Sequence, residues 1–366
     1  MASDDWLQQG LQIVGEAINV ETDDLRDHET WKFLGLGDML AAATASDLNN
    51  AGIPAPVDIF TKCPTVGDFK AFLVGEVKQT EKSGEAIAAS TPVETADPWD
   101  GVPKPKVPLS VVLQGQTSNA STVVFLLPDG SGAGTSYATL PPIGSNICLI
   151  ALNSPFLRQA ENFTCSIERM ARLWVDEIRK YQPKGMSYTL GGWSAGGYYS
   201  FEVTKLLTAA GEKVERLILI DSPCRLRYEA LPAQVVAELT KKGLMGASGA
   251  RKAPEWLVQH FTSTVLSVEK YTPIPLESEV PPKVNFIWVK EGLVKSIPDS
   301  GLEVDMSVKV TRFLLEPRPN LRSEGWEMLL PGATFTFDYM TGNHFQITQA
   351  PHSDSLGRLL RKVLSQ

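Results

Sequence analysis

One short segment constrains the fold of this chain more than any other: a serine between glycines, where a predicted strand meets a predicted helix. The segment Gly192–Gly196 reads Gly-Trp-Ser-Ala-Gly, follows the β-prone run 186–190, and precedes a helical pattern over 195–210. A strand can turn into a helix over so few residues only if the two backbones approach closely, which glycine allows because it has no Cβ. We expect this turn to strain Ser194 and to present its hydroxyl at the carboxyl edge of a sheet.

The chain after residue 108 alternates predicted strands with predicted helices, which is typical of a mainly parallel sheet covered by helices on both faces. Strands are predicted at 111–113, 123–127, 148–151, 187–190, 217–220, 284–289 and 334–337. Helices are predicted at 165–181, 195–210 and 353–364. Residues 224–275 interrupt the alternation with helical patterns at 233–241 and 254–270, separated by the glycine-containing segment 243–249. Such an insertion above the sheet edge would form a movable lid over Ser194.

The serine needs a base to take its proton, and that base is usually a histidine oriented by a carboxylate. The chain has four histidines, and His28 comes too early for the α/β-hydrolase order of serine, acid, histidine. His260 lies in an amphipathic helix pattern, where a packed or partly exposed histidine is expected. We predict that His344 is the base, because it lies between the last predicted strand and the closing helix. His352, where that helix starts, is the alternative.

Two carboxylates are candidates for the group that orients the histidine. Asp221 ends the apolar run 216–221, and Glu291 ends the next such run, 286–291. Many α/β-hydrolases use the later strand, and either carboxylate could instead cap a helix or form a turn. The residues alone therefore leave both candidates open.

Acyl transfer to a serine also needs backbone N–H groups that face the developing negative oxygen. One is expected from Ala195, the residue after the serine. The other is expected from Gly130 or Ser131, in the glycine-rich loop 128–134 that follows the apolar run 122–127. The glycines of this loop allow its backbone to approach a substrate closely.

The 366 residues exceed the size of one small domain, and the composition changes along the chain. Residues 76–108 are rich in Lys, Glu, Thr, Ser, Ala and Pro, and repeated prolines make the last part extended, so a linker is predicted. We expect a helical unit over 1–75, this linker over 76–108, and the α/β unit over 109–366, with the lid at about 224–275.

Composition excludes several classes of function. A net charge of −8 without a basic stripe argues against nonspecific binding of nucleic acid. No apolar run is long enough to cross a membrane, and the acidic amino terminus lacks a signal-peptide core. The four cysteines show no metal-site spacing, so we expect free thiols in a cytoplasmic protein that holds no metal and no cofactor.

Several motifs together resemble the thioesterase domains that end fungal non-reducing polyketide synthases. They are Gly-Trp-Ser-Ala-Gly-Gly at 192–197, Leu-Ile-Leu-Ile-Asp-Ser-Pro-Cys at 217–224, Pro-Glu-Trp-Leu at 254–257 with His-Phe at 260–261 and Tyr-Thr-Pro at 271–273, and Gly-Asn-His-Phe at 342–345. The resemblance covers residues 110–366. In that family the acid lies on the strand after the nucleophile's helix, so the resemblance implies Asp221 rather than Glu291.

The segment before the linker resembles the acyl carrier protein that precedes such a thioesterase, through residues 31–36 and 58–69. A working carrier reads Asp-Ser-Leu at its second helix start, and this serine carries phosphopantetheine. Here residues 37–39 read Gly-Asp-Met, so Asp38 stands in the place of the serine, and a carboxylate cannot form the phosphodiester. Ser46 lies about two helical turns further on and would face elsewhere. The resemblance therefore implies a pseudo-carrier, a four-helix domain without the prosthetic arm.

The residues and the resemblance together imply an α/β-hydrolase fold with a helical lid insertion, preceded by a small all-α carrier-like domain. The expected activity is that of a trans-acting thioesterase: Ser194 takes a polyketide chain from the carrier protein of a partner non-reducing polyketide synthase and releases it by hydrolysis or cyclisation. A stand-alone serine esterase or acyltransferase and a non-catalytic docking protein are the alternatives. We expect the pseudo-carrier to dock onto the partner synthase; a relic that only stabilises the chain is the other hypothesis.

Overall fold

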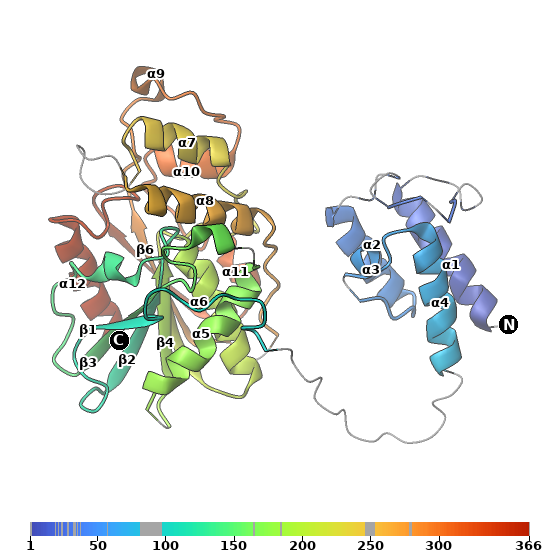
Figure 1. Cartoon of the computed structure of the whole chain (residues 1–366), viewed down its shortest axis with the longest axis horizontal. Helices are drawn as coiled ribbons and strands as arrows, with labels where there is room; N and C mark the ends of the chain where they lie inside the picture. The colour runs from blue at the N-terminus through green and yellow to red at the C-terminus, as the bar shows by residue number, and fades with distance from the viewer. Residues whose placement is uncertain are drawn as a thin grey trace. The chain divides into compact units, whose positions relative to one another are not determined.

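The computed structural model divides the chain into two units, Met1–Glu94 and Thr95–Gln366, which are described separately (Figure 1). The structure describes residues 2–18, 20, 22, 25–27, 29–31, 34, 36, 38–56, 58–80, 97–163, 165–183, 185–245, 253–277 and 280–365. Residues 81–96 of the predicted linker and part of the glycine-containing segment 243–249 therefore lie outside the described residues.

The amino-terminal unit is helical in its described part. Its helices are α1 (Ala2–Ile18), α2 (Asp38–Asn50), α3 (Ile59–Lys62) and α4 (Val66–Thr80). Trp31 lies at the centre of its core, where the indole N–H donates to the carbonyl oxygen of Cys63 at 2.7 Å and the ring packs edge-on against Phe60 and Phe69. Helix α4 begins with a reciprocal cap, because the backbone N–H of Thr65 and that of Asp68 each bond the other's side chain at 3.2 Å.

The second unit is built on a seven-stranded sheet with the order β1-β3-β2-β4-β5-β6-β7. The strands are β1 (Ser110–Gln114), β2 (Thr122–Leu127), β3 (Ile147–Leu152), β4 (Tyr188–Trp193), β5 (Val214–Ile220), β6 (Lys283–Val289) and β7 (Thr334–Met340). All neighbours pair in parallel except β1 with β3. The central strands read as nearly continuous apolar runs, because helices cover both faces of a parallel sheet.

Two apolar layers hold the helices against the sheet. Helices α5 (Ile167–Tyr181) and α6 (Ala195–Ala209) pack on one face, where Trp174 and Phe201 are completely buried. Helix α12 (His352–Leu364) packs on the other face through Leu356, Leu360 and Val363, all of which are completely buried. The amphipathic patterns of α5 and α12 follow from this placement, since one stripe of each helix faces the sheet and the other faces water.

The insertions beyond the sheet edge supply further helices. Between β5 and β6 lie α7 (Ala233–Lys241) and α8 (Glu255–Glu269), which correspond to the helical patterns predicted there. Between β6 and β7 lie α9 (Ile297–Ser300), α10 (Lys309–Leu315) and α11 (Trp326–Leu329), none of which the sequence pattern predicts. Figure 1 shows α7, α8 and α10 grouped at one end of the sheet. This end carries the carboxyl termini of the parallel strands, and with them the candidate site.

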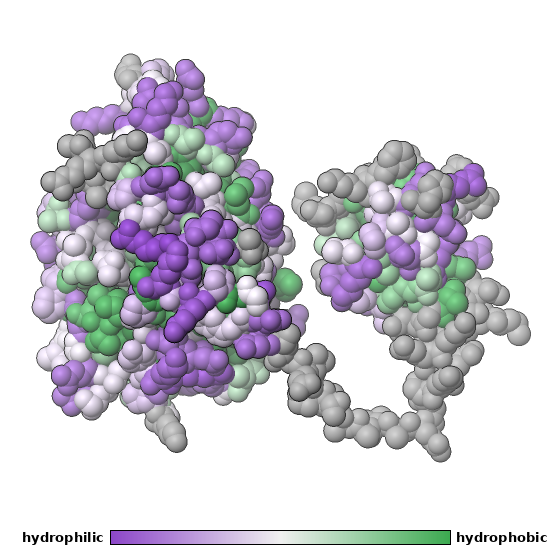
Figure 2. All heavy atoms as spheres, viewed as in Figure 1, coloured by the Kyte–Doolittle hydropathy of each residue, from purple (hydrophilic) through white to green (hydrophobic). Residues whose placement is uncertain are grey.

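The face drawn in Figure 2 carries small separate groups of apolar residues among hydrophilic ones. Among the described helices, none combines the length and the apolar character that crossing a bilayer requires.

Candidate active site

The predicted turn between strand and helix is present, and its glycines are sterically required. Ser194 lies between β4 and α6 with a φ of 57°, a left-handed conformation that residues with a side chain rarely adopt. A Cβ on Gly192 would lie 2.4 Å from the carbonyl carbon of Gly196, and one on Gly196 would lie 2.7 Å from the carbonyl oxygen of Leu127. The strand, the helix and the neighbouring strand β2 can meet here only because these side chains are absent.

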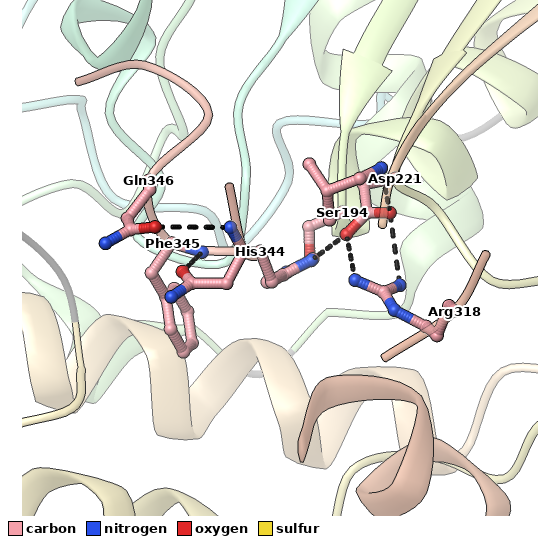
Figure 3. Close-up of polar contacts among 8 residues, drawn as sticks. Ser194, Asp221, Arg318, His344, Phe345 and Gln346 are labelled. Carbon is pink, nitrogen blue, oxygen red and sulfur yellow. Dashed lines mark hydrogen bonds and ion pairs between the residues drawn. The ribbon is translucent and has the colours of Figure 1, made fainter. Parts of the chain in front are cut away.

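The structure brings three predicted site residues into one hydrogen-bonded chain (Figure 3). The Nε2 atom of His344 lies 3.0 Å from the Oγ of Ser194, and its Nδ1 lies 2.7 Å from the Oδ2 of Asp221. They come from the carboxyl ends of three parallel strands, β4, β5 and β7, which meet at the same edge. Because a carboxylate only accepts hydrogen bonds, Nδ1 carries the proton, and Nε2 is left as an acceptor for the serine hydroxyl.

The two alternatives from the sequence have other partners. The Oε1 of Glu291 accepts a hydrogen bond from the backbone N–H of Gly342 at 3.0 Å, and so supports the loop that leads to His344. His352 is the first residue of α12, and its Nδ1 lies 3.4 Å from the Oγ1 of Thr341. Both residues therefore brace the loop after β7, and it is His344 that reaches the serine.

An arginine that the sequence pattern does not point to binds the carboxylate of Asp221. The Nη1 and Nη2 of Arg318 lie 3.1 Å from its Oδ1 and Oδ2, a bidentate pair (Figure 3). The guanidinium also stacks 3.8 Å from the ring centre of Phe313. Burial of the carboxylate favours its neutral form, but the charge of Arg318 and the hydrogen bond from His344 outweigh it and hold the pKa of Asp221 below its usual value. The acid is thus kept ionised although it is completely buried.

Ser194 opens into a mainly apolar chamber that is partly open to solvent. Helix α8 contributes Phe261, Val265 and Val268 to the wall, and α10 contributes Val310, Phe313 and Leu314. Both insertions therefore shape the space next to the serine. The lining suits an apolar acyl group, and water would find few hydrogen-bond partners there.

Two of the residues predicted to stabilise the negative oxygen line this chamber. Gly130 and Ala195 line it together with Ser194. The hydroxyl of Ser131 donates to the Oδ1 of Asp129 at 2.6 Å, and the backbone N–H of Ser131 bonds the same carboxylate. Gly130 and Ser131 lie in the loop that connects β2 with the short 3₁₀ turn Gly134–Tyr137, and Ala195 begins α6.

The position predicted to lack the prosthetic arm is described only in part. Asp38 is the first residue of α2, and the side chains of residues 37–39 lie outside the described residues. Ser46 is exposed on the same helix. Across the described ranges, no group of three or more His, Cys, Asp or Glu residues is arranged to hold a metal ion.

Comparison with known proteins gives matches for both units. Residues 122–364 match the thioesterase domain family, and residues 11–73 match the phosphopantetheine attachment site family. The non-reducing polyketide synthase terA of Aspergillus terreus is 32% identical over 384 aligned positions, which cover 100% of this chain and 18% of that protein. The non-reducing polyketide synthase Preu8 of Preussia isomera is 32% identical over 96% of this chain and 17% of its own length. The chain thus spans less than a fifth of the length of these two relatives.

A solved structure supports the fold. The NocB thioesterase domain, in covalent complex with a fluorophosphonate nocardicin G analog, superposes with a TM-score of 0.51 at 20% identity. The superposition covers 70% of this chain and 100% of that one. Together with the family matches, it confirms the predicted fold class, an α/β-hydrolase-like sheet preceded by a helical carrier-like region.

Proposed function

Because the chain belongs to the family of thioesterase domains, we propose that it takes a polyketide chain from a carrier-protein thioester onto Ser194 and then releases it. The observation that carries this proposal is the unbroken chain of hydrogen bonds from Ser194 through His344 to Asp221, at the base of an apolar chamber. A nucleophile, a base and a carboxylate in this order are the components of serine acyl transfer.

The proposed first half-reaction forms an acyl-enzyme. The Nε2 of His344 takes the hydroxyl proton while the Oγ of Ser194 attacks the thioester carbonyl carbon. The negative oxygen that forms is stabilised by the backbone N–H of Ala195 and by an N–H of Gly130 or Ser131. The carbon–sulfur bond then breaks, the leaving thiolate receives the proton from His344, and the acyl group stays on Ser194 as an ester.

The second half-reaction runs through the same groups with a different nucleophile. With water as the acceptor, His344 removes its proton and the product is a free acid. With a hydroxyl or enolate carbon of the bound chain as the acceptor, the product is a lactone or a carbocycle. Hydrolysis is the default because water needs no binding site of its own, and intramolecular cyclisation is the alternative that the apolar chamber favours by excluding water.

The proposed substrate class and partner come from the relatives and from Asp38. Both relatives are named as non-reducing polyketide synthases, and they match the carrier-like unit as well as the thioesterase domain. We propose that residues 1–75 form a pseudo-carrier, residues 76–108 a linker, and residues 109–366 the thioesterase, with a lid at about 224–275. A carrier with Asp38 at the attachment position cannot receive phosphopantetheine and so cannot hold an acyl thioester. The thioester would therefore arrive on the carrier of another protein.

The test of this function mixes the protein with carriers loaded with candidate polyketides and identifies released products by mass spectrometry. We expect release by the wild type and none by Ser194→Ala. If residues 1–75 dock the enzyme, deleting them should raise the carrier concentration needed for half-maximal rate and leave the saturated rate unchanged. Turnover of simple esters without release from any carrier would instead favour the stand-alone esterase. If the deletion of residues 1–75 does not change the carrier concentration for half-maximal rate, the hypothesis that these residues only stabilise the chain would be favoured.

The pseudo-carrier proposal predicts that the chain cannot be loaded. Incubation with coenzyme A and a phosphopantetheinyl transferase should leave the intact mass unchanged, because no serine stands at the start of α2. The matched control is Asp38→Ser, which should gain the mass of one phosphopantetheinyl group. Modification of the wild type, at Ser46 or elsewhere, would contradict the proposal.

A further inference from the structure

Four hydrogen-bond donors hold the carboxylate of Asp221, which fills the acceptor sites of its two oxygens. Oδ1 accepts from the backbone N–H of Val289 at 3.2 Å and from the Nη1 of Arg318 at 3.1 Å. Oδ2 accepts from the Nη2 of Arg318 at 3.1 Å and from the Nδ1 of His344 at 2.7 Å. Among these donors, Arg318 is the one that binds both oxygens, so it fixes the plane of the carboxylate.

Asp221 has a strained backbone conformation that its neighbours must hold. Its φ is 43°, in the left-handed region that residues with a side chain rarely adopt, and it directly follows β5. Such a conformation persists only where the surrounding structure maintains it. The backbone N–H of Asp221 donates to the carbonyl oxygen of Ile287 at 2.8 Å. Strand β6 thus holds the main chain and one carboxylate oxygen, and Arg318 holds the carboxylate as a whole.

Arg318 is itself fixed through its own main chain. Its backbone N–H donates to the carbonyl oxygen of Lys290, the residue after β6, at 2.7 Å. A Cβ on Gly292 would lie 2.0 Å from the carbonyl oxygen of Leu315, so the segment after α10 can lie this close to the end of β6 only because residue 292 is glycine. The guanidinium therefore reaches the acid from a segment that is attached to the sheet edge.

We propose that Arg318 is a positioning residue for acyl transfer, which keeps the buried carboxylate of Asp221 charged and turned toward His344. This inference rests on the proposed function. Phe313 lines the chamber and stacks on the guanidinium, whereas Arg318 does not line the chamber, so it acts through the acid rather than on the substrate. A charged carboxylate accepts the proton of Nδ1 and leaves Nε2 free for the serine. A protonated one can donate to Nδ1, which places the imidazole proton on Nε2.

A role in stability alone accounts poorly for this arginine. The Nε of Arg318 is buried and has no hydrogen-bond partner, which is unfavourable for a polar atom. Removing two charges from water also costs free energy that their attraction often fails to offset, and apolar side chains of similar volume can replace such a pair without loss of stability. Apolar side chains cannot present a charged carboxylate to a histidine. That is what the arginine contributes at this position.

The expected effect of removing Arg318 has a definite direction. Burial raises the pKa of Asp221, whereas the charge of Arg318 and then the hydrogen bond from His344 lower it. Other titratable side chains on the surrounding segments stay the same in every variant: Asp129 after β2, which acts on His344, Cys224 and Tyr228 after β5, Lys290 and Glu291 after β6, and Glu324 before α11. Without the guanidinium, the pKa of Asp221 should therefore rise, and its charged form should be lost at a higher pH.

The test compares Arg318→Met with Arg318→Lys, which both keep a long unbranched side chain. In hydrolysis of a small acyl thioester, Arg318→Met should move the acid limb of kcat/KM up by about one to two pH units. Its kcat at neutral pH should fall by about 10- to 100-fold, and its KM should change by less than about threefold. Arg318→Lys keeps the charge and loses the bidentate fork, so its acid limb should stay within about half a pH unit of the wild type.

The activity of Arg318→Met should recover as the pH rises, which a merely structural defect would not produce. A loss that is equal at every pH overturns the inference, and so does an acid limb that moves as far in Arg318→Lys as in Arg318→Met. Arg318→Gln serves as the neutral variant if Arg318→Met does not fold.

Two further readouts separate this inference from the proposed function. The rate at which a fluorophosphonate probe labels Ser194 gives the same pH profile without any thioester, so a wild type that is labelled but releases no acyl group contradicts the proposed function alone. The carbon-13 resonance of the Asp221 carboxyl group reports its ionisation whatever the activity. It should titrate at a higher pH in the neutral variant than in the wild type, and an unchanged titration would refute the role of Arg318.

Discussion

Ser194→Ala is expected to lower the rate of acyl transfer by about 10⁴- to 10⁶-fold and to abolish the acyl-enzyme. The alanine has no atom that can attack the thioester carbonyl, although the chamber, His344 and the backbone N–H groups remain. The variant should still hydrolyse the thioester faster than the uncatalysed reaction in water, because the remaining hydrogen-bond donors still stabilise the transition state for attack by water. Steady-state kinetics gives the rate, and a fluorophosphonate probe followed by intact mass reports the nucleophile.

The control for this experiment is Ser46→Ala, which removes an exposed serine on α2. It should be labelled by the probe as fast as the wild type. Labelling of Ser194→Ala at the wild-type rate would show that another residue is the nucleophile. A wild type that is never labelled would favour the non-catalytic docking protein.

Asp221→Asn is expected to lower kcat by about 10⁴-fold, the second largest effect. The side-chain amide of asparagine can donate to the Nδ1 of His344, which stabilises the tautomer that has its proton on Nε2 and cannot accept one from Ser194. The same substitution leaves the guanidinium of Arg318 buried without its carboxylate, so the thermal unfolding midpoint should fall as well. Measuring kcat well below that midpoint separates the loss of activity from unfolding.

Glu291→Gln is the matched control, because it neutralises the rival carboxylate and keeps an oxygen that can accept from Gly342. Its kcat should stay within about threefold of the wild type, since only a supporting hydrogen bond is weakened. The opposite ranking, with Glu291→Gln more harmful than Asp221→Asn, would move the role of the acid to Glu291.

The fold and the enzyme class could be predicted from the sequence because both depend on local signatures. The turn at Ser194 requires glycines at fixed positions around one serine, and the central strands of a parallel sheet require apolar runs. The thioesterase class that these motifs suggested is confirmed by the family match over residues 122–364. The polyketide synthases among the relatives also agree with the resemblance, at the level of the family.

The contacts around the site could not be predicted in the same way, because they join residues far apart in the chain. Arg318 lies 97 positions from Asp221, in a segment where no element is predicted, and no local pattern marks a buried guanidinium. His260 could be predicted only as a packed or partly exposed residue of a helix. The Nδ1 of His260 lies 2.9 Å from the backbone carbonyl oxygen of Gly130, and residue types do not show which backbone carbonyl a side chain will meet. Helix α10 was missed because its seven residues are too few for a helical period to stand out.

The chamber walls contributed by α8 and α10 differ in their contacts with other parts of the site. This difference decides which residues can be changed to alter the product. The α8 wall is also bonded to the loop beside Ser194, because His260 and Thr264 both contact the carbonyl oxygen of Gly130, so substitutions on α8 would act on that loop as well as on the shape. Among the described residues, α10 makes no hydrogen bond to that loop, although Phe313 packs against the guanidinium of Arg318, which binds Asp221. Substitutions of Val310 and Leu314 are therefore expected to change the size of the acyl chain that the chamber accepts with the smallest loss of kcat.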